Sequence, residues 1–140
     1  MRILAAAALF LALAASAPAA QAQPGASATA PAAAGSAQRR AILGALRPAI
    51  VRDLRSPVEF VVQRIGVEDG WALVVADPQR PGGGAIDARH LPYFEDRDGL
   101  TVYALLRFAR GRWTLHDHVV GPTDVWYCGV QGPPRSLTGC

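Results

Sequence analysis

Residues 58–76 read VEFVVQRIGVEDGWALVVA, and the fold class is predicted mainly from this stretch. It contains two runs that are rich in β-branched and aromatic residues, the types that strands favour. Between the runs, Asp69-Gly70 is a typical signal for a tight hairpin turn. The stretch therefore predicts two antiparallel strands, over 58–67 and 71–76.

Two more strands are predicted further along the chain, over 100–109 and 112–120, with a turn at Arg110-Gly111 between them. A Pro/Gly-rich loop over 77–89 separates the two hairpins, and residues 90–94 form a short strand or a turn. Because hairpins joined without a crossover helix pair in antiparallel fashion, we expect a four-stranded antiparallel meander.

A helix is predicted before the strands, because apolar residues recur there at helical spacing. Ser36 is a suitable N-cap residue, and Ser56-Pro57 is expected to end the helix. Pro48 removes one backbone hydrogen bond and is expected to kink the helix. The apolar stripe consists of Ile42, Leu43, Leu46, Ile50 and Leu54. We expect this stripe to cover one face of the meander, which makes the fold α+β.

The N-terminus has the features of a signal peptide. Arg2 supplies a positive charge, and an uncharged apolar run follows that is too short to span a bilayer. We expect cleavage after Ala22, with Ala19 as the second choice, so that no membrane anchor remains. The alternative is an uncleaved N-terminal anchor, which the short apolar run disfavours.

The remaining chain is expected to form a linker and one domain. Residues 23–37 are Ala, Pro, Gly, Ser, Gln and Thr without any charge, a composition that predicts a disordered linker. Residues 38–140 are long enough for a single α+β domain with a modest core. We place the mature protein in the periplasm or outside the cell.

Cys128 and Cys140 are the only cysteines of the chain. An exported protein meets oxidising conditions, so we expect them to form a disulfide that holds the C-terminal segment. The alternative is a redox or metal-binding pair, but the spacing does not match a C-x-x-C motif.

Charge and composition exclude some classes of partner. The chain has no lysine, and its 14 basic residues are arginines spread along the sequence. A nucleic-acid binder normally has a basic stripe or a known module, and neither is present. We therefore expect neither a nucleic-acid partner nor a cofactor, and an envelope protein or peptide as the partner.

A resemblance is carried by several short segments: RAIL at 40–43, LRP at 46–48, PVEFVV at 57–62, GWA at 70–72, LLR at 105–107, GRW at 111–113 and GPTDVW at 121–126. In these segments the chain resembles a group of uncharacterised exported proteins of proteobacteria, over most of the stretch from 40 to 127. The resemblance implies export and carries no activity.

The order of elements is similar to that of cystatin-like and nuclear-transport-factor-like folds. Element order alone is analogy and implies no function. Cystatin-like inhibitors use a Gln-x-Val-x-Gly loop, and the nearest stretch, Gln63-Arg64-Ile65-Gly66, is one residue shorter and lies in a predicted strand. We do not expect protease inhibition by that route.

His116, Asp117 and His118 form the most suggestive cluster. In a regular strand the two histidines point to the same side and can share a metal ion, with His90 or an aspartate as the third ligand. The alternative is that both are solvated. Alternation places Asp117 on the core face, where a carboxylate needs a partner. The alternatives are a bulge that turns it outward or a pairing with an arginine.

Two other segments are weaker candidates for binding. Residues 81–84, Pro-Gly-Gly-Gly, suggest a phosphate loop but lack the Gly-Lys-Ser/Thr ending, which favours a flexible surface loop. Residues 123–127 place Asp124 and Trp126 in a patch that can contact a ligand. The alternative is that the aromatic residues of this patch pack over one end of the core.

Three functions follow from these residues. The first is a non-enzymatic exported binding module that uses a sheet face or the Pro/Gly loop. The second is a small enzyme or ligand pocket in which Asp117 and a histidine act as an acid–base pair. The third is a metal-binding protein that uses His116 and His118.

Overall fold

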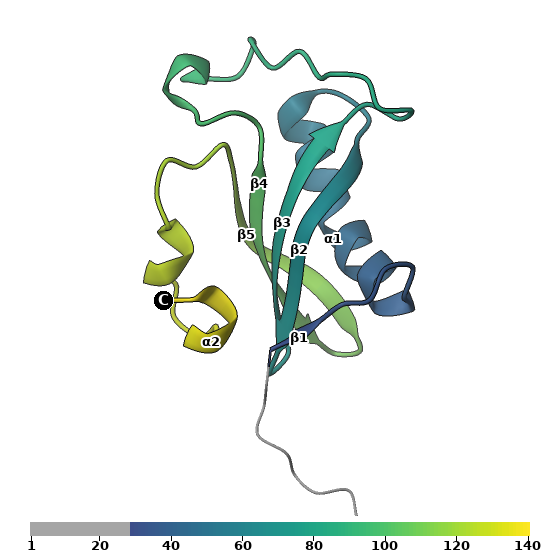
Figure 1. Ribbon diagram of the computed structural model, residues 1–140, viewed down its shortest axis with the longest axis vertical. Coiled ribbons are helices and arrows are strands. Elements are labelled where there is room, and N and C mark those ends of the chain that lie inside the picture. The colour runs from purple at the N-terminus through teal and green to yellow at the C-terminus, as the bar shows by residue number, and fades with distance from the viewer. Residues whose placement is uncertain (1–28) are drawn as a thin grey trace, which may run out of the picture.

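The computed structural model describes residues 29–140, which form a sheet with a helix on one face and a C-terminal segment on the other (Figure 1). The strands are β1 (Ala30–Pro31), β2 (Glu59–Glu68), β3 (Trp71–Gln79), β4 (Val102–Ala109) and β5 (Arg112–Val120). The helices are α1 (Ala37–Leu54), η1 (Phe94–Asp96), η2 (Trp126–Gly129) and α2 (Arg135–Thr138), of which η1 and η2 are 3-10 helices.

The predicted signal peptide and the first part of the predicted linker lie outside the described residues. Within residues 29–140, no helix has the length and apolar character that crossing a membrane requires.

The sheet has five strands in the order β1-β2-β3-β4-β5, and every neighbouring pair is antiparallel. The α+β class and the meander of β2 to β5 are confirmed, but the predicted number of four strands is wrong. The additional strand is β1, in which Ala30 pairs with Val67 and Pro31 pairs with Gly66. The last part of the predicted linker therefore lies on the sheet. Proline fits there because an edge strand needs hydrogen bonds on one side only.

The predicted helix α1 is confirmed, while the kink expected at Pro48 stays a prediction. The Ser36 hydroxyl accepts a hydrogen bond from the backbone N–H of Arg39 at 3.1 Å, which caps the first turn. The helix continues through Pro48, and Arg55 ends it in the left-handed conformation with φ of 49°. Its buried residues are Ile42, Leu46, Ala49, Ile50 and Leu54.

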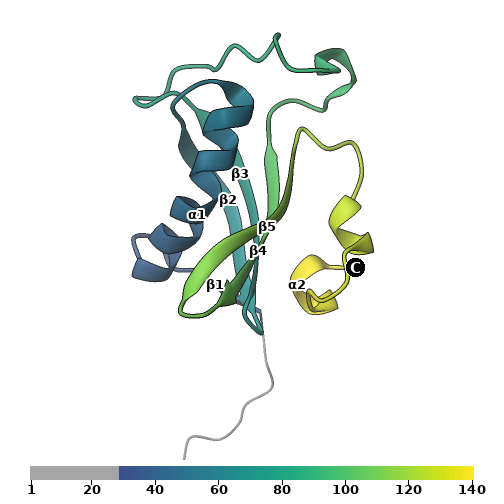
Figure 2. The same ribbon diagram turned by 180° about the vertical axis from the view of Figure 1, so that it is seen from behind.

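The two faces of the sheet carry separate cores, and Figures 1 and 2 show the layer on each side. On the α1 side, the helical stripe packs against Ala72, Val74 and Ala76 of β3 and against Val102, Ala104 and Leu106 of β4. On the other side, Trp71, Leu73, Leu105 and Leu137 form a second core, with Trp126, Tyr127 and Val130 packed against it. The C-terminal segment is thus the cover of the second face.

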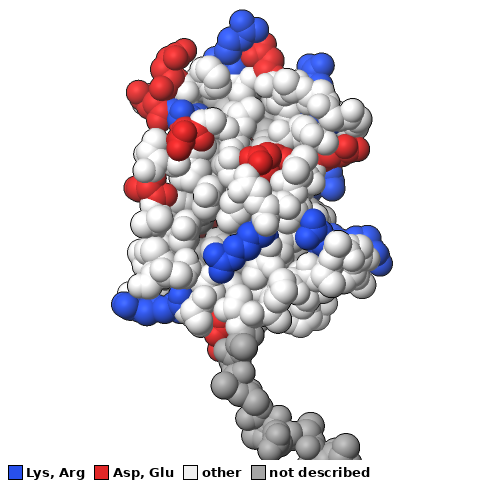
Figure 3. Space-filling view, in the orientation of Figure 1, with Lys and Arg blue, Asp and Glu red and all other residues white. Residues whose placement is uncertain are grey.

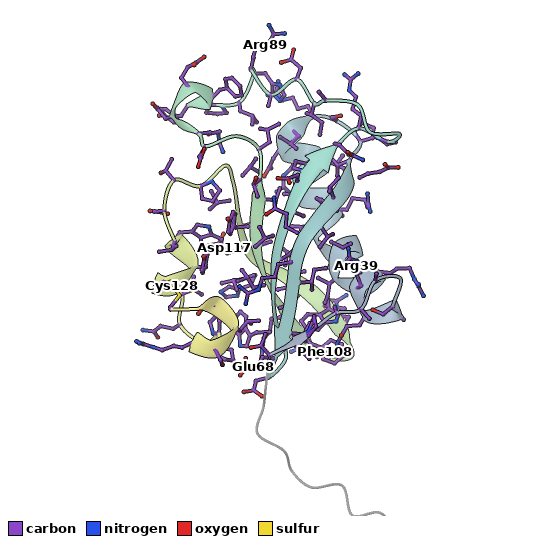
Figure 4. The ribbon with its side chains drawn as sticks, in the orientation of Figure 1. Arg39, Glu68, Arg89, Phe108, Asp117 and Cys128 are labelled. Carbon is purple, nitrogen blue, oxygen red and sulfur yellow. A yellow bond between two sulfur atoms is a disulfide. The ribbon has the colours of Figure 1, made fainter. Side chains whose placement is uncertain are left out.

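The disulfide between Cys128 and Cys140 is formed, with a Cα–Cα distance of 5.6 Å, which confirms the predicted pairing. Two polar contacts also hold the segment to β2. Ser136 Oγ donates to Glu68 Oε1 at 2.7 Å, and Arg64 Nη2 donates to the carbonyl of Leu137 at 2.8 Å. Figure 4 shows Cys128 on this segment and Glu68 at the lower end of the sheet.

Candidate functional site

A β-bulge in β5 separates the two histidines that were expected to lie on one side. Leu106 pairs with Leu115 and Leu105 pairs with Asp117, so His116 has no partner on β4. One extra residue reverses the alternation for the rest of the strand. The His116 and Trp71 rings lie edge to face, with 5.0 Å between their centroids. His118 instead points to α1, so the two rings do not converge and the expected geometry for a shared metal ion is wrong.

The same bulge turns Asp117 away from the α1 core, so its expected place on the core face is also wrong. Asp117 is exposed, and Figure 4 shows it on the side of the sheet that faces the C-terminal segment. Its Oδ1 accepts a hydrogen bond from the backbone N–H of His118 at 2.8 Å. The bulge was one of the two alternatives for this residue, and the structure favours it.

His90 lies in the loop before η1 and lines a different cleft from His118. Within residues 29–140, no group of three or more His, Cys, Asp or Glu side chains is arranged to hold a metal ion.

In the segment over 123–127 the two aromatic residues pack against the body of the domain, whereas Thr123, Asp124 and Val125 are exposed. Trp126 and Tyr127 contact the second core, and Tyr127 stacks on Tyr103 with 5.8 Å between ring centroids. Asp124 Oδ1 accepts a hydrogen bond from the backbone N–H of Trp126 at 3.2 Å, which stabilises the start of η2. These contacts favour a structural role for the segment.

A long loop from 80 to 101 crosses the C-terminal end of α1 (Figures 1 and 2). Within it, η1 is the one helix or strand. Long loops of this kind in compact domains often carry binding functions. Two clefts lie beside the loop, and their linings have different chemistry.

The larger cleft has a volume of about 660 Å³ and is lined mainly by arginines and apolar residues. It lies between the end of α1 and the first part of the loop. We call it the arginine cleft, and its lining is Leu54, Arg55, Ser56, Pro57, Arg80, Pro81, Ile86, Asp87, Arg89 and His90.

Charges in the arginine cleft are unbalanced. Three arginines face one acid, which leaves a net charge of +2 when His90 is neutral. Arg89 binds Asp87 with two hydrogen bonds, at 2.9 and 2.7 Å, and Figure 4 shows Arg89 pointing outward at the crest of the loop. Arg55 and Arg80 form no ion pair with any acid in residues 29–140.

The hydrogen bonds between Arg89 and Asp87 shift the pKa values of both side chains. The hydrogen bonds from the side chain and backbone of Arg89 hold the pKa of the Asp87 carboxyl well below its ordinary value of 3.8. The same side-chain hydrogen bond raises the pKa of Arg89. Asp87 therefore stays ionised at neutral pH and pairs with Arg89, while Arg55 and Arg80 have no acidic partner within residues 29–140.

The three glycines that follow Pro81 do not line the arginine cleft, and their backbone contacts do not form a phosphate cradle. The backbone N–H of Gly82 donates to Glu59 Oε2 at 3.2 Å, and the N–H of Arg80 donates to the carbonyl of Gly84 at 2.7 Å. A carboxylate of β2 thus takes a donor that a phosphate would need.

The smaller cleft, of about 350 Å³, contains a histidine–carboxylate pair. His118 Nε2 lies 2.6 Å from Asp53 Oδ2, and the two side chains are 16% and 32% exposed. We call it the His118 cleft, and its lining is Asp53, Leu91, Pro92, Arg97, His118, Val119 and Val120.

Sequence reasoning missed Asp53, Arg55 and Arg80. Asp53 has one local signal, because an acid in the last turn of a helix opposes the helix dipole and needs a compensating partner. The two arginines have no local signal, since an exposed arginine looks the same whether or not a cleft lies beside it. Comparison of the chain with protein-family models, with curated proteins and with solved structures gives no match.

Proposed function

We propose that the chain is an exported binding module whose arginine cleft holds the acidic side chains of an envelope protein or peptide. The observation that carries the proposal is the pair Arg55 and Arg80, two guanidinium groups that line the larger of the two clefts beside the loop and form no ion pair with an acid in residues 29–140. A guanidinium presents planar pairs of N–H donors that match a carboxylate.

Charge and shape both support an anionic ligand. The C-terminal end of α1 contributes a partial negative charge of about half an elementary unit. The net charge of +2 on the cleft residues is larger, so the cleft is positive overall. Leu54, Pro57 and Ile86 give the cleft an apolar part on which the methylene groups of an acidic residue can pack. Arginines and acids are interspersed on the face shown in Figure 3, so this face carries no wide basic stripe of the kind that binds nucleic acid.

Export belongs to the same proposal and has three supports. The leader has the charge and length of a signal peptide. The disulfide fits an oxidising compartment. The short segments quoted above resemble uncharacterised exported proteins. The likeness in element order to cystatin-like and nuclear-transport-factor-like folds is an analogy and adds nothing on function.

A binding assay with a fluorescein-labelled hexaglutamate peptide tests the proposal. The variant Arg55→Gln/Arg80→Gln removes two positive charges and leaves polar, uncharged side chains that are shorter than arginine. We expect it to weaken binding by at least about tenfold, since hydrogen bonds to charged groups are lost. The matched control is Arg39→Gln/Arg112→Gln, which changes the net charge equally and lies away from the cleft.

Equal affinities for the two double variants would refute the assignment of the cleft. Competition by inorganic phosphate, measured in the same assay, separates the possible sources of the anion. If phosphate displaced the peptide at far lower concentration than free glutamate does, the ligand would be a phosphate group and the peptide assignment would be wrong.

A further inference from the structure

The His118 cleft has a chemistry that the arginine cleft lacks. His118 belongs to β5 and Asp53 to the last turn of α1, so the pair joins the sheet to the helix. An acid at this end of a helix is electrostatically unfavourable, and the imidazole gives it a partner. The ring is thereby held in one orientation by a carboxylate that accepts from Nε2.

The other ring nitrogen of His118 is open to a ligand. Within residues 29–140, His118 Nδ1 has no hydrogen-bond partner. Among the side chains of these residues, the one fully buried nitrogen or oxygen without a partner is Trp126 Nε1, so His118 Nδ1 is not fully buried and is in contact with solvent. The His118 side chain lines the cleft. When a neutral ring donates from Nε2 to Asp53, Nδ1 carries a lone pair and accepts a hydrogen bond.

The charge of the cleft points to a neutral ligand. Arg97 and Asp53 cancel when His118 is neutral. The Arg97 guanidinium is also engaged, because Nε donates to the carbonyl of Pro92 at 3.3 Å and Nη1 donates to the carbonyl of Val120. It therefore ties the loop to β5 and has less capacity to attract an anion than the free guanidiniums of the arginine cleft.

The rest of the lining is apolar, with Leu91, Pro92 and two valines around the imidazole. A ligand must therefore have an apolar body and one donor that reaches Nδ1. From this geometry we infer that the His118 cleft is a second binding site, for a small neutral molecule with an apolar body and a hydroxyl group that donates to His118 Nδ1. This inference does not depend on the arginine cleft.

Phenol and anisole are matched probes for this site, since they differ in whether the oxygen can donate. We expect phenol to bind about five- to tenfold more tightly than anisole, which corresponds to one hydrogen bond. In long-range ¹H–¹⁵N spectra of the full mature chain, recorded where the ring is neutral, phenol should move the His118 Nδ1 signal and the amides of Leu91 and Val119.

Two variants complete the experiment. His118→Ala is expected to reduce phenol binding to the level of anisole. The control His116→Ala removes a histidine of the same strand that points away from α1, and it should leave phenol binding unchanged. If His118→Ala fails to fold, the comparison of phenol with anisole on the unaltered protein still decides.

Several results would overturn the inference. These are equal affinities for phenol and anisole, a shift of Nε2 in place of Nδ1, chemical-shift changes that map outside the cleft, or no saturable phenol binding below about 10 mM, a weak affinity for a ligand of this size.

Discussion

Removal of the disulfide is expected to lower the free energy of unfolding by about 3 kcal/mol. Cys128 and Cys140 are 12 residues apart in sequence, and their Cα atoms are 5.6 Å apart in the folded chain. In the chain-entropy model, a closed loop of this length removes about that much conformational freedom from the unfolded state. The change to make is Cys128→Ser/Cys140→Ser, measured by urea unfolding.

The same reasoning predicts that the C-terminal segment stays docked without the disulfide. Leu137 is fully buried in the second core, and its carbonyl accepts a hydrogen bond from Arg64. The side chains of Ser136 and Glu68 form a further tie. These contacts do not involve the sulfur atoms, so the disulfide acts mainly on the unfolded chain.

A double-mutant cycle separates these two effects. Leu137→Ala is expected to cost about 2–5 kcal/mol, the range for a buried leucine. If the segment stays docked, this cost is the same with and without the disulfide, within about 0.5 kcal/mol. If the cost of Leu137→Ala vanished in the double-serine background, the disulfide would be holding the segment in place, and the reasoning would be wrong. Wild-type protein in reductant should behave as the double-serine variant does.

Four further results are expected. Gly121→Ala should destabilise the fold by more than about 1 kcal/mol in thermal melts, because φ is 62° there and an added Cβ collides with the carbonyl oxygen of Gly99. In the same melts Gly44→Ala should stabilise the fold by about 0.5–1 kcal/mol, because Gly44 lies in the helix and an added Cβ meets no other atom. Asp87→Asn frees Arg89 and should strengthen hexaglutamate binding by about threefold, while weaker binding would contradict the assigned role of the cleft. The pKa of Asp87 is lower in the folded state, so its pairing favours folding above about pH 3.8. This stabilisation disappears as the pH falls through the folded-state pKa. Carboxyl ¹³C NMR of Asp87 can follow the titration.

Much of the fold could be predicted because its signals are local. The helical stripe, the N-cap at Ser36 and the turn at Asp69-Gly70 each depend on neighbours a few residues away. The disulfide followed from the cysteine count and the expected compartment. The features that escaped prediction depend on contacts between distant segments. β1 is an example, because its composition is that of a linker and its pairing with β2 arises only when the sheet edge is present.

The candidate site was mostly missed for the same reason. A single bulge at His116 reverses the faces of the residues that follow, and Val119 and Val120 in succession were the one sign that regular alternation fails there. His118 was a candidate, but its partner Asp53 is 65 residues away in sequence. Arg55 and Arg80 come together only because the loop folds over the end of α1.

The most direct test of the arginine cleft is to observe its guanidinium groups while the acidic peptide binds. In ¹H–¹⁵N spectra of the arginine side chains, the Nε–H signals of Arg55 and Arg80 should shift on addition of hexaglutamate and give the same dissociation constant. The signals of Arg39 and Arg112 should stay in place. Equal shifts of all four signals, or shifts confined to Arg39 and Arg112, would contradict the proposal that this cleft holds acidic side chains.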